Sequence, residues 1–154
     1  MAEPATFQVE VFKAVRAAAP PAFIRQVLTR AATLPEIAAR LRDGPSSVAV
    51  RLTTDLELKR LNRSYAGDDH ATDVLSFAGA ADHIGDIAIS WPAVVRQSAE
   101  HGHPQTTELA LLCVHGLLHL LGWDHASARQ RKEMSRLTVE ALELSHLRLA
   151  SGRL

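Results

Sequence analysis

Three histidines in one short stretch of the chain could hold a metal ion. His115 and His119 are four residues apart, so on an α-helix they lie on one face, separated along the axis by about 6 Å. Gly122 follows them, and glycine ends helices readily because it takes the left-handed backbone conformation without a Cβ penalty. The chain can then turn back, which would bring His125 to the same ion.

Three neutral imidazoles on a tetrahedral ion leave the fourth position for water, as in catalytic zinc sites. Zinc would lower the pKa of that water towards ~7 and polarise a carbonyl or phosphoryl oxygen. We therefore predict a hydrolase with one Zn²⁺ per chain, bound by His115, His119 and His125. We also predict that His119 is a catalytic residue. Nickel and copper suit three imidazoles too, but zinc is the ion expected in a hydrolase.

The residue after the first histidine argues against a protease. The spacing H-x-x-x-H-x-x-G-x-x-H is that of the metzincin proteases, in which a general-base glutamate directly follows the first ligand. Gly116 occupies that position here. The remaining candidates for the base are Asp124, Glu108 or a zinc-bound hydroxide acting alone. Asp124 has a second interpretation, in which it only orients a histidine ligand.

The other histidines and the cysteine carry no such signal. Cys113 lies two residues before His115 on an apolar helix, and we expect it in the core. The remaining histidines lie in predicted loops or at helix ends, and we expect them to be solvated: His70, His83, His101, His103 and His146.

The elements that position these residues follow from hydrophobic periodicity. Alternating residues predict strands, and spacing near 3.6 residues predicts helices. The predicted strands are 6–12, 47–53, 73–77 and 86–90, and the predicted helices are 22–32, 35–41, 55–65, 92–101, 107–121 and 126 to about 149. This order indicates an α+β domain with a small mixed sheet covered by helices.

Composition narrows the class of protein. A chain of 154 residues, 47% hydrophobic and 22% charged, has the size of one globular domain spanning residues 1–154. Lys plus Arg equals Asp plus Glu at 17 each, so any nucleic acid must be bound by a local patch. The single cysteine fits a reducing compartment. Residues 1–11 lack the features of a signal peptide, and the apolar run 109–123 is shorter than a membrane span, so we expect a cytoplasmic protein without a membrane partner.

Four ordered motifs resemble those of one family. Residues 115–125 fit the signature H-G-x-L-H-L-x-G-[YW]-D-H of the YbeY endoribonucleases of bacteria. Upstream, Leu61-Asn62 with Tyr65 resembles the family's L-N-x-x-Y, residues 72–77 resemble its T-[DN]-V-L-S-F, and residues 85–87 resemble its G-D-I. The chain is therefore similar to YbeY proteins from Leu61 to His125.

The resemblance implies a fold and a function. It implies an α+β fold with a mainly parallel four-stranded sheet, about five to six helices, and a cleft with the zinc at its base. It also implies a cytoplasmic, zinc-dependent endoribonuclease that is specific for single-stranded RNA. Its substrates would be rRNA precursors, with roles in rRNA maturation and ribosome quality control, and its partner the small ribosomal subunit; no DNA is expected. Zinc-bound water could act as the nucleophile or as an acid–base partner of the RNA 2′-hydroxyl.

The sequence departs from the family where phosphate-binding cations are expected. The family usually has arginine after the tyrosine of L-N-x-x-Y and lysine two residues later, whereas this chain has Ala66 and Asp68. Alanine cannot supply bidentate phosphate recognition, and aspartate would repel phosphate. Arg60 and Arg63, on the same predicted helix, are hypothesised to compensate; alternatively they only solvate its surface.

Two other groups of residues have both a functional and a simpler interpretation. The resemblance puts Asp73 and Ser76 on a strand bordering the cleft as substrate-binding residues, although such residues often only stabilise turns. On the last predicted helix, glutamates dilute the basic residues, which we interpret as a solvated surface rather than an RNA-binding face. These basic residues are Arg129, Arg131, Lys132 and Arg136.

Two rival functions remain open. One is a zinc hydrolase of peptides or another small substrate, supported by the ligand spacing and opposed by Gly116. The other is a non-catalytic, ribosome-associated zinc-binding module, supported by Ala66 and Asp68.

Overall fold

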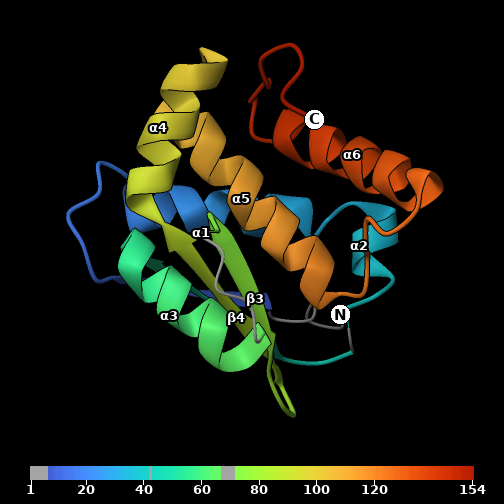
Figure 1. The fold of residues 1–154 in the computed structure, drawn as a ribbon. Helices are drawn as coiled ribbons and strands as arrows, with labels where there is room; N and C mark the ends of the chain where they lie inside the picture. The colour runs from blue at the N-terminus through green and yellow to red at the C-terminus, as the bar shows by residue number, and fades with distance from the viewer. Residues whose placement is uncertain (1–6, 42, 67–71) are drawn as a thin grey trace.

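The computed structural model describes residues 7–41, 43–66 and 72–154, with only the backbone described at positions 65 and 66. These residues form a four-stranded sheet and six helices (Figure 1). The elements are β1 (Phe7–Lys13), α1 (Pro21–Ala31), α2 (Pro35–Ala38), β2 (Ser46–Thr53), α3 (Asp55–Ala66), β3 (Val74–Ala78), β4 (His83–Ser90), α4 (Trp91–His101), α5 (Gln105–Leu120) and α6 (Ala128–Glu143). The predicted α+β fold is confirmed.

The sheet is mixed and mainly parallel, as predicted. Its strand order is β1-β2-β4-β3; β1, β2 and β4 run parallel, and β3 pairs antiparallel with β4 at one edge. Parallel neighbours need a long crossover connection, whereas antiparallel neighbours can be joined by a hairpin. Helices α1 and α2 lie in the connection from β1 to β2, and a short turn joins β3 to β4.

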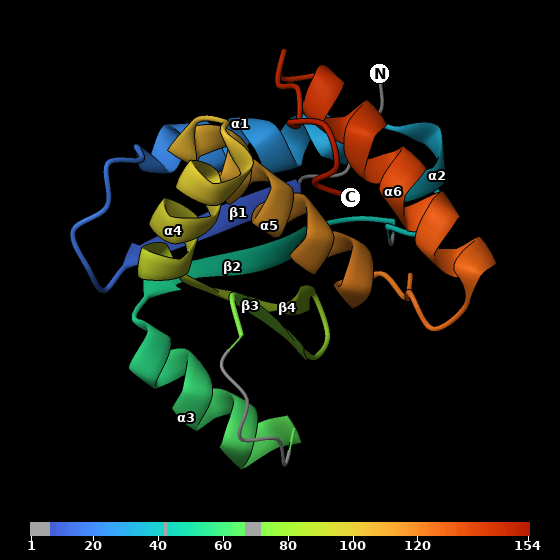
Figure 2. The same cartoon turned by 45° about the horizontal axis from the view of Figure 1, so that its top comes forward.

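Helices cover the two faces of the sheet unequally (Figure 2). Helices α1, α4, α5 and α6 lie on one side of it, and α3 lies on the other. Strand alternation explains this arrangement, because Val48, Val50 and Leu52 of β2 are fully buried on the side of α1 and α5. Helix α5 contacts α1, α4, α6, β3 and β4, and it is buried along most of its length. It is the central helix of the core.

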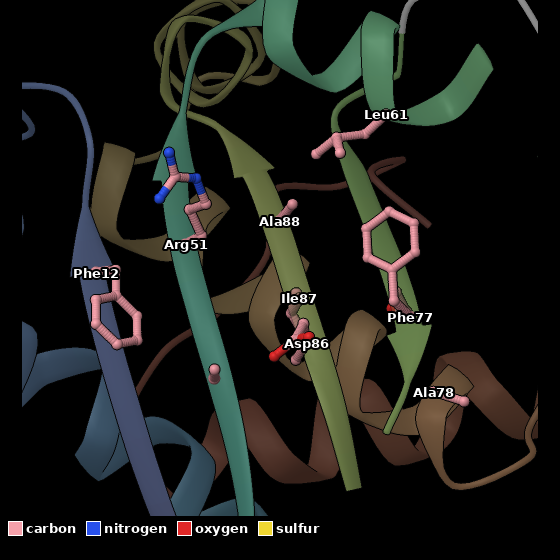
Figure 3. A pocket seen from close by; sticks show the side chains of 10 residues that line it. Phe12, Arg51, Leu61, Phe77, Ala78, Asp86, Ile87 and Ala88 are labelled. Atoms are coloured by element: carbon pink, nitrogen blue, oxygen red, sulfur yellow. The ribbon is translucent and has the colours of Figure 1, made fainter. Parts of the chain in front are cut away.

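The face of the sheet that carries α3 contains a hollow of about 690 Å³. Phe12, Arg51, Asp86 and Phe77 project into it from neighbouring strands, with Leu61 of α3 at its edge (Figure 3). Arg51 is held there by a 2.6 Å hydrogen bond to Glu57. None of the three candidate histidines lines this hollow, so the predicted metal chemistry belongs to the opposite face.

Three elements differ from the sequence prediction by three residues or more. Helix α2 ends at Ala38, three residues before its predicted end. The last helix ends at Glu143 rather than near residue 149, because His146 adopts a φ of 59° and the Leu147 N–H bonds back to the Leu142 carbonyl. Strand β4 begins at His83, three residues before the predicted start. The side chain of His83, which was predicted to be solvated, bonds to Ser47 and Asp86 at 2.8 Å each and is half-buried.

No helix among the described ranges is both long and apolar enough to cross a membrane. This includes α5, whose apolar residues are buried by the sheet and by neighbouring helices.

Gly116 marks a close approach of α5 to the sheet. A Cβ atom at this position would lie 2.7 Å from Cγ2 of Ile87 on β4 and 3.1 Å from its Cγ1 and Cδ1. Such distances are shorter than normal van der Waals contact. Any side chain at position 116 would therefore push α5 away from β4, and a glutamate there would have to displace Ile87.

We expect Gly116→Ala to lower the free energy of unfolding by about 1–3 kcal/mol, the usual cost of overpacking a core. Denaturant unfolding measures this change. Ile87→Ala empties the space that the new methyl group needs, so the double variant should be more stable than the sum of the two single effects predicts. Additive effects, or a Gly116→Ala protein as stable as wild type, would contradict the close-packing explanation.

Candidate metal centre

The three predicted histidines converge on one point. His115 and His119 project from the last turns of α5, and His125 lies in the loop before α6. The Nε2 atoms of His115 and His119 are 3.0 Å apart, and one ligand nitrogen from each histidine lies within 4.8 Å of the other two. Tetrahedral zinc with bonds near 2.0–2.1 Å spaces its nitrogen ligands by about 3.4 Å. Small side-chain rotations would bring the three nitrogens to that spacing.

The turn after α5 positions the third histidine. Gly122 has a φ of 97°, and the Trp123 N–H bonds to the Leu118 carbonyl, a pattern that ends helices with a left-handed residue. The guanidinium of Arg40 lies 3.6 Å from the centre of the Trp123 ring and donates to the Leu121 carbonyl. The predicted helix end at Gly122 is confirmed. Arg40, which follows α2 in the sequence, stabilises the turn through these two contacts.

The electrostatics of the cluster favour neutral imidazoles. Burial, followed by the charges of His119, His125 and Arg153, lowers the pKa of His115 to about 4. Burial and the charge of His125 also lower the pKa of His119, despite an opposing effect of Asp124. Neutral imidazole is the form that binds metals. Near pH 7 these two ligands are therefore ready to coordinate without losing a proton.

The cluster opens into a hollow of about 540 Å³ between α5 and β3. Asp73 and Ser76, the two residues expected to border the cleft, line this hollow together with all three histidines. The Ser76 hydroxyl donates to the Gly116 carbonyl at 3.2 Å, so it also ties β3 to α5. Their contact with substrate stays a prediction.

Asp124 lies beside the cluster in a solvated position. Its carboxylate accepts the His125 backbone N–H at 2.7 Å and lies 3.8 Å from Nδ1 of the same residue. The side chain is 61% exposed, so its free oxygen can reach water or a substrate. A catalytic role for Asp124 stays a prediction.

The arginines proposed to compensate for Ala66 lie elsewhere. Arg60 and Arg63 are on α3, and neither lines the hollow with the histidines. Arg60 pairs with Glu57 at 3.6 Å. Asp68 and the side chain of Ala66 lie outside the described residues. Phosphate binding by Arg60 or Arg63 stays a prediction that no described contact supports.

Glu108 is engaged in a separate buried network. Its carboxylate accepts hydrogen bonds of 3.0 and 2.6 Å from Arg153 and one of 2.7 Å from His103. Nδ1 of His103 accepts the Ala150 N–H at 3.1 Å, so its proton lies on Nε2 and is donated to Glu108. Glu108 is fully buried, which removes it from the candidates for general base.

This network corrects the expectation for His103. Its side chain is only 4% exposed, whereas the sequence prediction placed it in solvent. The short loop between α4 and α5 folds His103 back onto Glu108, five residues later. Its other hydrogen-bond partner, Ala150, follows α6 and is 47 residues away. No local sequence pattern predicts that contact. Cys113, by contrast, is buried as predicted, and burial raises the pKa of its thiol to about 12.

The fold and the histidine cluster define an α+β protein with a three-histidine site that could hold a metal ion. A family model described as Endoribonuclease YbeY matches residues 10–146. The chain belongs to the YbeY family.

Individual relatives agree with this assignment. The chain is 52% identical over 94 residues to a protein named Endoribonuclease YbeY from Roseiflexus sp. (strain RS-1), a match that covers 53% of this chain and 59% of the relative. It is 47% identical over 112 residues to a protein of the same name from Chloroflexus aurantiacus, covering 65% and 72% of the two chains. The match to the Roseiflexus protein therefore spans less than two thirds of that relative's length.

A solved structure has a similar fold. The solution structure of TM1509 from Thermotoga maritima superimposes with a TM-score of 0.59 at 24% identity, covering 90% of this chain and 91% of that one. This likeness supports the architecture alone.

The Glu108 network predicts a pH-dependent loss of stability in Arg153→Ala. Burial raises the pKa of Glu108, but the hydrogen bonds from Arg153 and His103 outweigh it and hold that pKa below its ordinary value. Stability from the ionised carboxylate is therefore fully present above about pH 4.5 and is lost as pH falls through the lower pKa of the folded state. Arg153→Ala should lower the free energy of unfolding by about 3 kcal/mol at pH 7. The decrease should be smaller at pH values where Glu108 is protonated.

Denaturant unfolding at several pH values measures this effect. The matched control is Arg148→Ala, because Arg148 is exposed and forms no ion pair within the described part of the chain. Its stability should stay within about 0.5 kcal/mol of wild type. Equal stability of the two variants at pH 7 would refute the role of Arg153.

Proposed function

We propose that this chain is a zinc-dependent endoribonuclease specific for single-stranded RNA. Its substrates are rRNA precursors, and it acts in rRNA maturation and ribosome quality control with the small ribosomal subunit, in the cytoplasm, as one domain spanning residues 1–154. One observation carries the proposal. In a chain of the YbeY family, three imidazoles converge at one point of an open hollow.

The donor set fits zinc. Three nitrogen ligands with an open side are typical of catalytic zinc, whereas structural sites usually use cysteine, and the chain's only cysteine is buried in the core. When bound, zinc would supply an acidified water and Lewis-acid polarisation of a phosphoryl oxygen. His115, His119 and His125 would hold it.

The chain's own residues fit distinct roles around that point. Burial keeps His115 and His119 neutral, so they can ligate at physiological pH. Asp124 is proposed as the proton acceptor, because its exposed carboxylate lies beside His125 and forms no ion pair with a described lysine or arginine. Asp73 and Ser76 line the hollow on the side of β3 and are proposed to contact the RNA.

The packing of α5 supports a phosphodiester rather than a peptide substrate. A metzincin-type protease needs a glutamate directly after the first ligand. Here Ile87 occupies the space that a side chain at Gly116 would need. The chemistry must therefore proceed without that base, and in RNA the 2′-hydroxyl offers an internal nucleophile that DNA lacks.

The shape of the site supports a single-stranded substrate. The hollow beside the histidines has a volume of about 540 Å³. Unpaired nucleotides can splay into such a space, whereas a duplex presents a regular surface that is recognised by its shape.

The test is cleavage of a single-stranded fragment from the 3′ end of precursor rRNA, with zinc content measured in every sample. Wild type should cleave this RNA but leave duplex RNA and single-stranded DNA intact. His119→Ala should lose both zinc and cleavage. The matched control is His146→Asn, because His146 is exposed and asparagine tolerates its φ of 59°.

Two outcomes would contradict the proposal. Equal cleavage by wild type and His119→Ala would trace the activity to a contaminating nuclease. A zinc-loaded wild type that leaves the RNA intact would favour a non-catalytic zinc-binding module.

A further inference from the structure

Arg131 differs from Arg136, another basic residue of α6, in its charge partners. Arg136 pairs with Glu36 at 2.6 Å and with Glu140 at 2.9 Å, so its charge is neutralised. Within the described part of the chain, Arg131 has no carboxylate partner. Its guanidinium makes one long hydrogen bond, of 3.4 Å, to the carbonyl of His125. Arg131 is thus a cation with unused donors beside a predicted metal ligand.

A second hollow, of about 170 Å³, lies on the α6 side of the histidines. It shares His115 and His125 with the larger hollow near β3. The two depressions therefore meet at the cluster, one towards β3 and the other towards α6. A single strand whose reacting phosphate lies at the cluster would extend into both.

The lining of the α6-side hollow is mostly apolar and includes Met134 and Leu154, but two of its side chains can bind a phosphate. Arg131 and Ser135 are four residues apart on one helix, so they face the same side and offer a guanidinium and a hydroxyl together. Met134, which is buried, contributes an apolar surface, and the Thr138 hydroxyl is committed to the Met134 carbonyl. Charge-assisted hydrogen bonds from arginine are among the strongest that phosphate oxygens receive.

The larger hollow, near β3, has no such cation among its described lining residues. Its described lining includes Asp73 but no lysine or arginine. A polyanion crossing the cluster therefore meets an unpaired cation on the α6 side rather than on the β3 side.

We propose that Arg131, with Ser135, forms a subsite for the phosphate next to the reacting one in a single-stranded RNA. This inference rests on the proposed function and adds to it a substrate-binding residue. It also revises our interpretation of the basic residues of α6, because the structure singles out one of them.

The experiment compares three variants of the zinc-loaded protein. Arg131→Gln removes the charge but keeps an N–H donor for the His125 carbonyl, and Arg131→Lys keeps the charge. Lys132→Gln is the matched control, because Lys132 is exposed on the same helix and does not line the hollow. For each protein, zinc content, the Kd of a short fluorescent single-stranded RNA over a range of salt concentrations, and the kcat and KM of cleavage are measured.

Arg131→Gln should weaken RNA binding about tenfold, as expected for one charged hydrogen bond. It should also reduce the slope of log Kd against log salt by about one. KM should rise more than kcat falls, with zinc content unchanged. Arg131→Lys should retain most of the affinity, and Lys132→Gln should stay within about twofold of wild type.

The outcomes separate this subsite from the proposed function. Equal Kd and salt slope for Arg131→Gln and Lys132→Gln would overturn the subsite, while cleavage by wild type would still support the nuclease. Zinc loss in Arg131→Gln would trace its effect to His125 and also overturn the subsite. RNA binding that depends on Arg131 in a wild type unable to cleave would support the subsite and contradict the nuclease. A wild type that binds no RNA would contradict both.

Discussion

The packing of α5 against the sheet is the interaction on which the rest of the structure depends. Because Gly116 has no side chain, the helix approaches Ile87 of β4 closely, and this contact sets the depth of the last turns of α5. His115 and His119 lie in those turns, half-buried at the floor of a hollow. That depth lowers the pKa values of both imidazoles. The same contact that stabilises the core thus prepares two ligands and excludes the glutamate of a protease.

Two polar clusters on α5 show how burial separates structure from function. The carboxylate of Glu108, near the start of the helix, accepts hydrogen bonds from Arg153 and His103. It is therefore not available for catalysis, and the loss of either partner would destabilise the fold. The histidines near the end of the helix lie against each other and against His125, and they face an open hollow. A satisfied buried network stabilises a fold, whereas convergent ligands beside solvent are typical of a site.

Local patterns in the sequence predicted most of this arrangement. The spacing of His115 and His119, together with the helix-ending Gly122, predicted the cluster because helix periodicity and glycine conformation are local properties. Strand alternation predicted the sheet to within a few residues at the ends of each strand. The reason for Gly116, the partners of His103 and the end of α6 at Glu143 were not predictable. The first two depend on Ile87 and Ala150, which only the tertiary fold brings to them. Helix α6 ends where His146 takes a positive φ, which residues other than glycine rarely adopt.

The central claim is that three imidazoles of this chain hold one zinc ion and leave a position open. Metal analysis combined with zinc X-ray absorption spectroscopy on the purified protein tests it most directly. The account predicts about one zinc per chain, with three nitrogen neighbours near 2.0–2.1 Å and one further oxygen. A zinc with sulfur neighbours, a fourth protein ligand in place of the oxygen, or a protein that fails to bind zinc would contradict it.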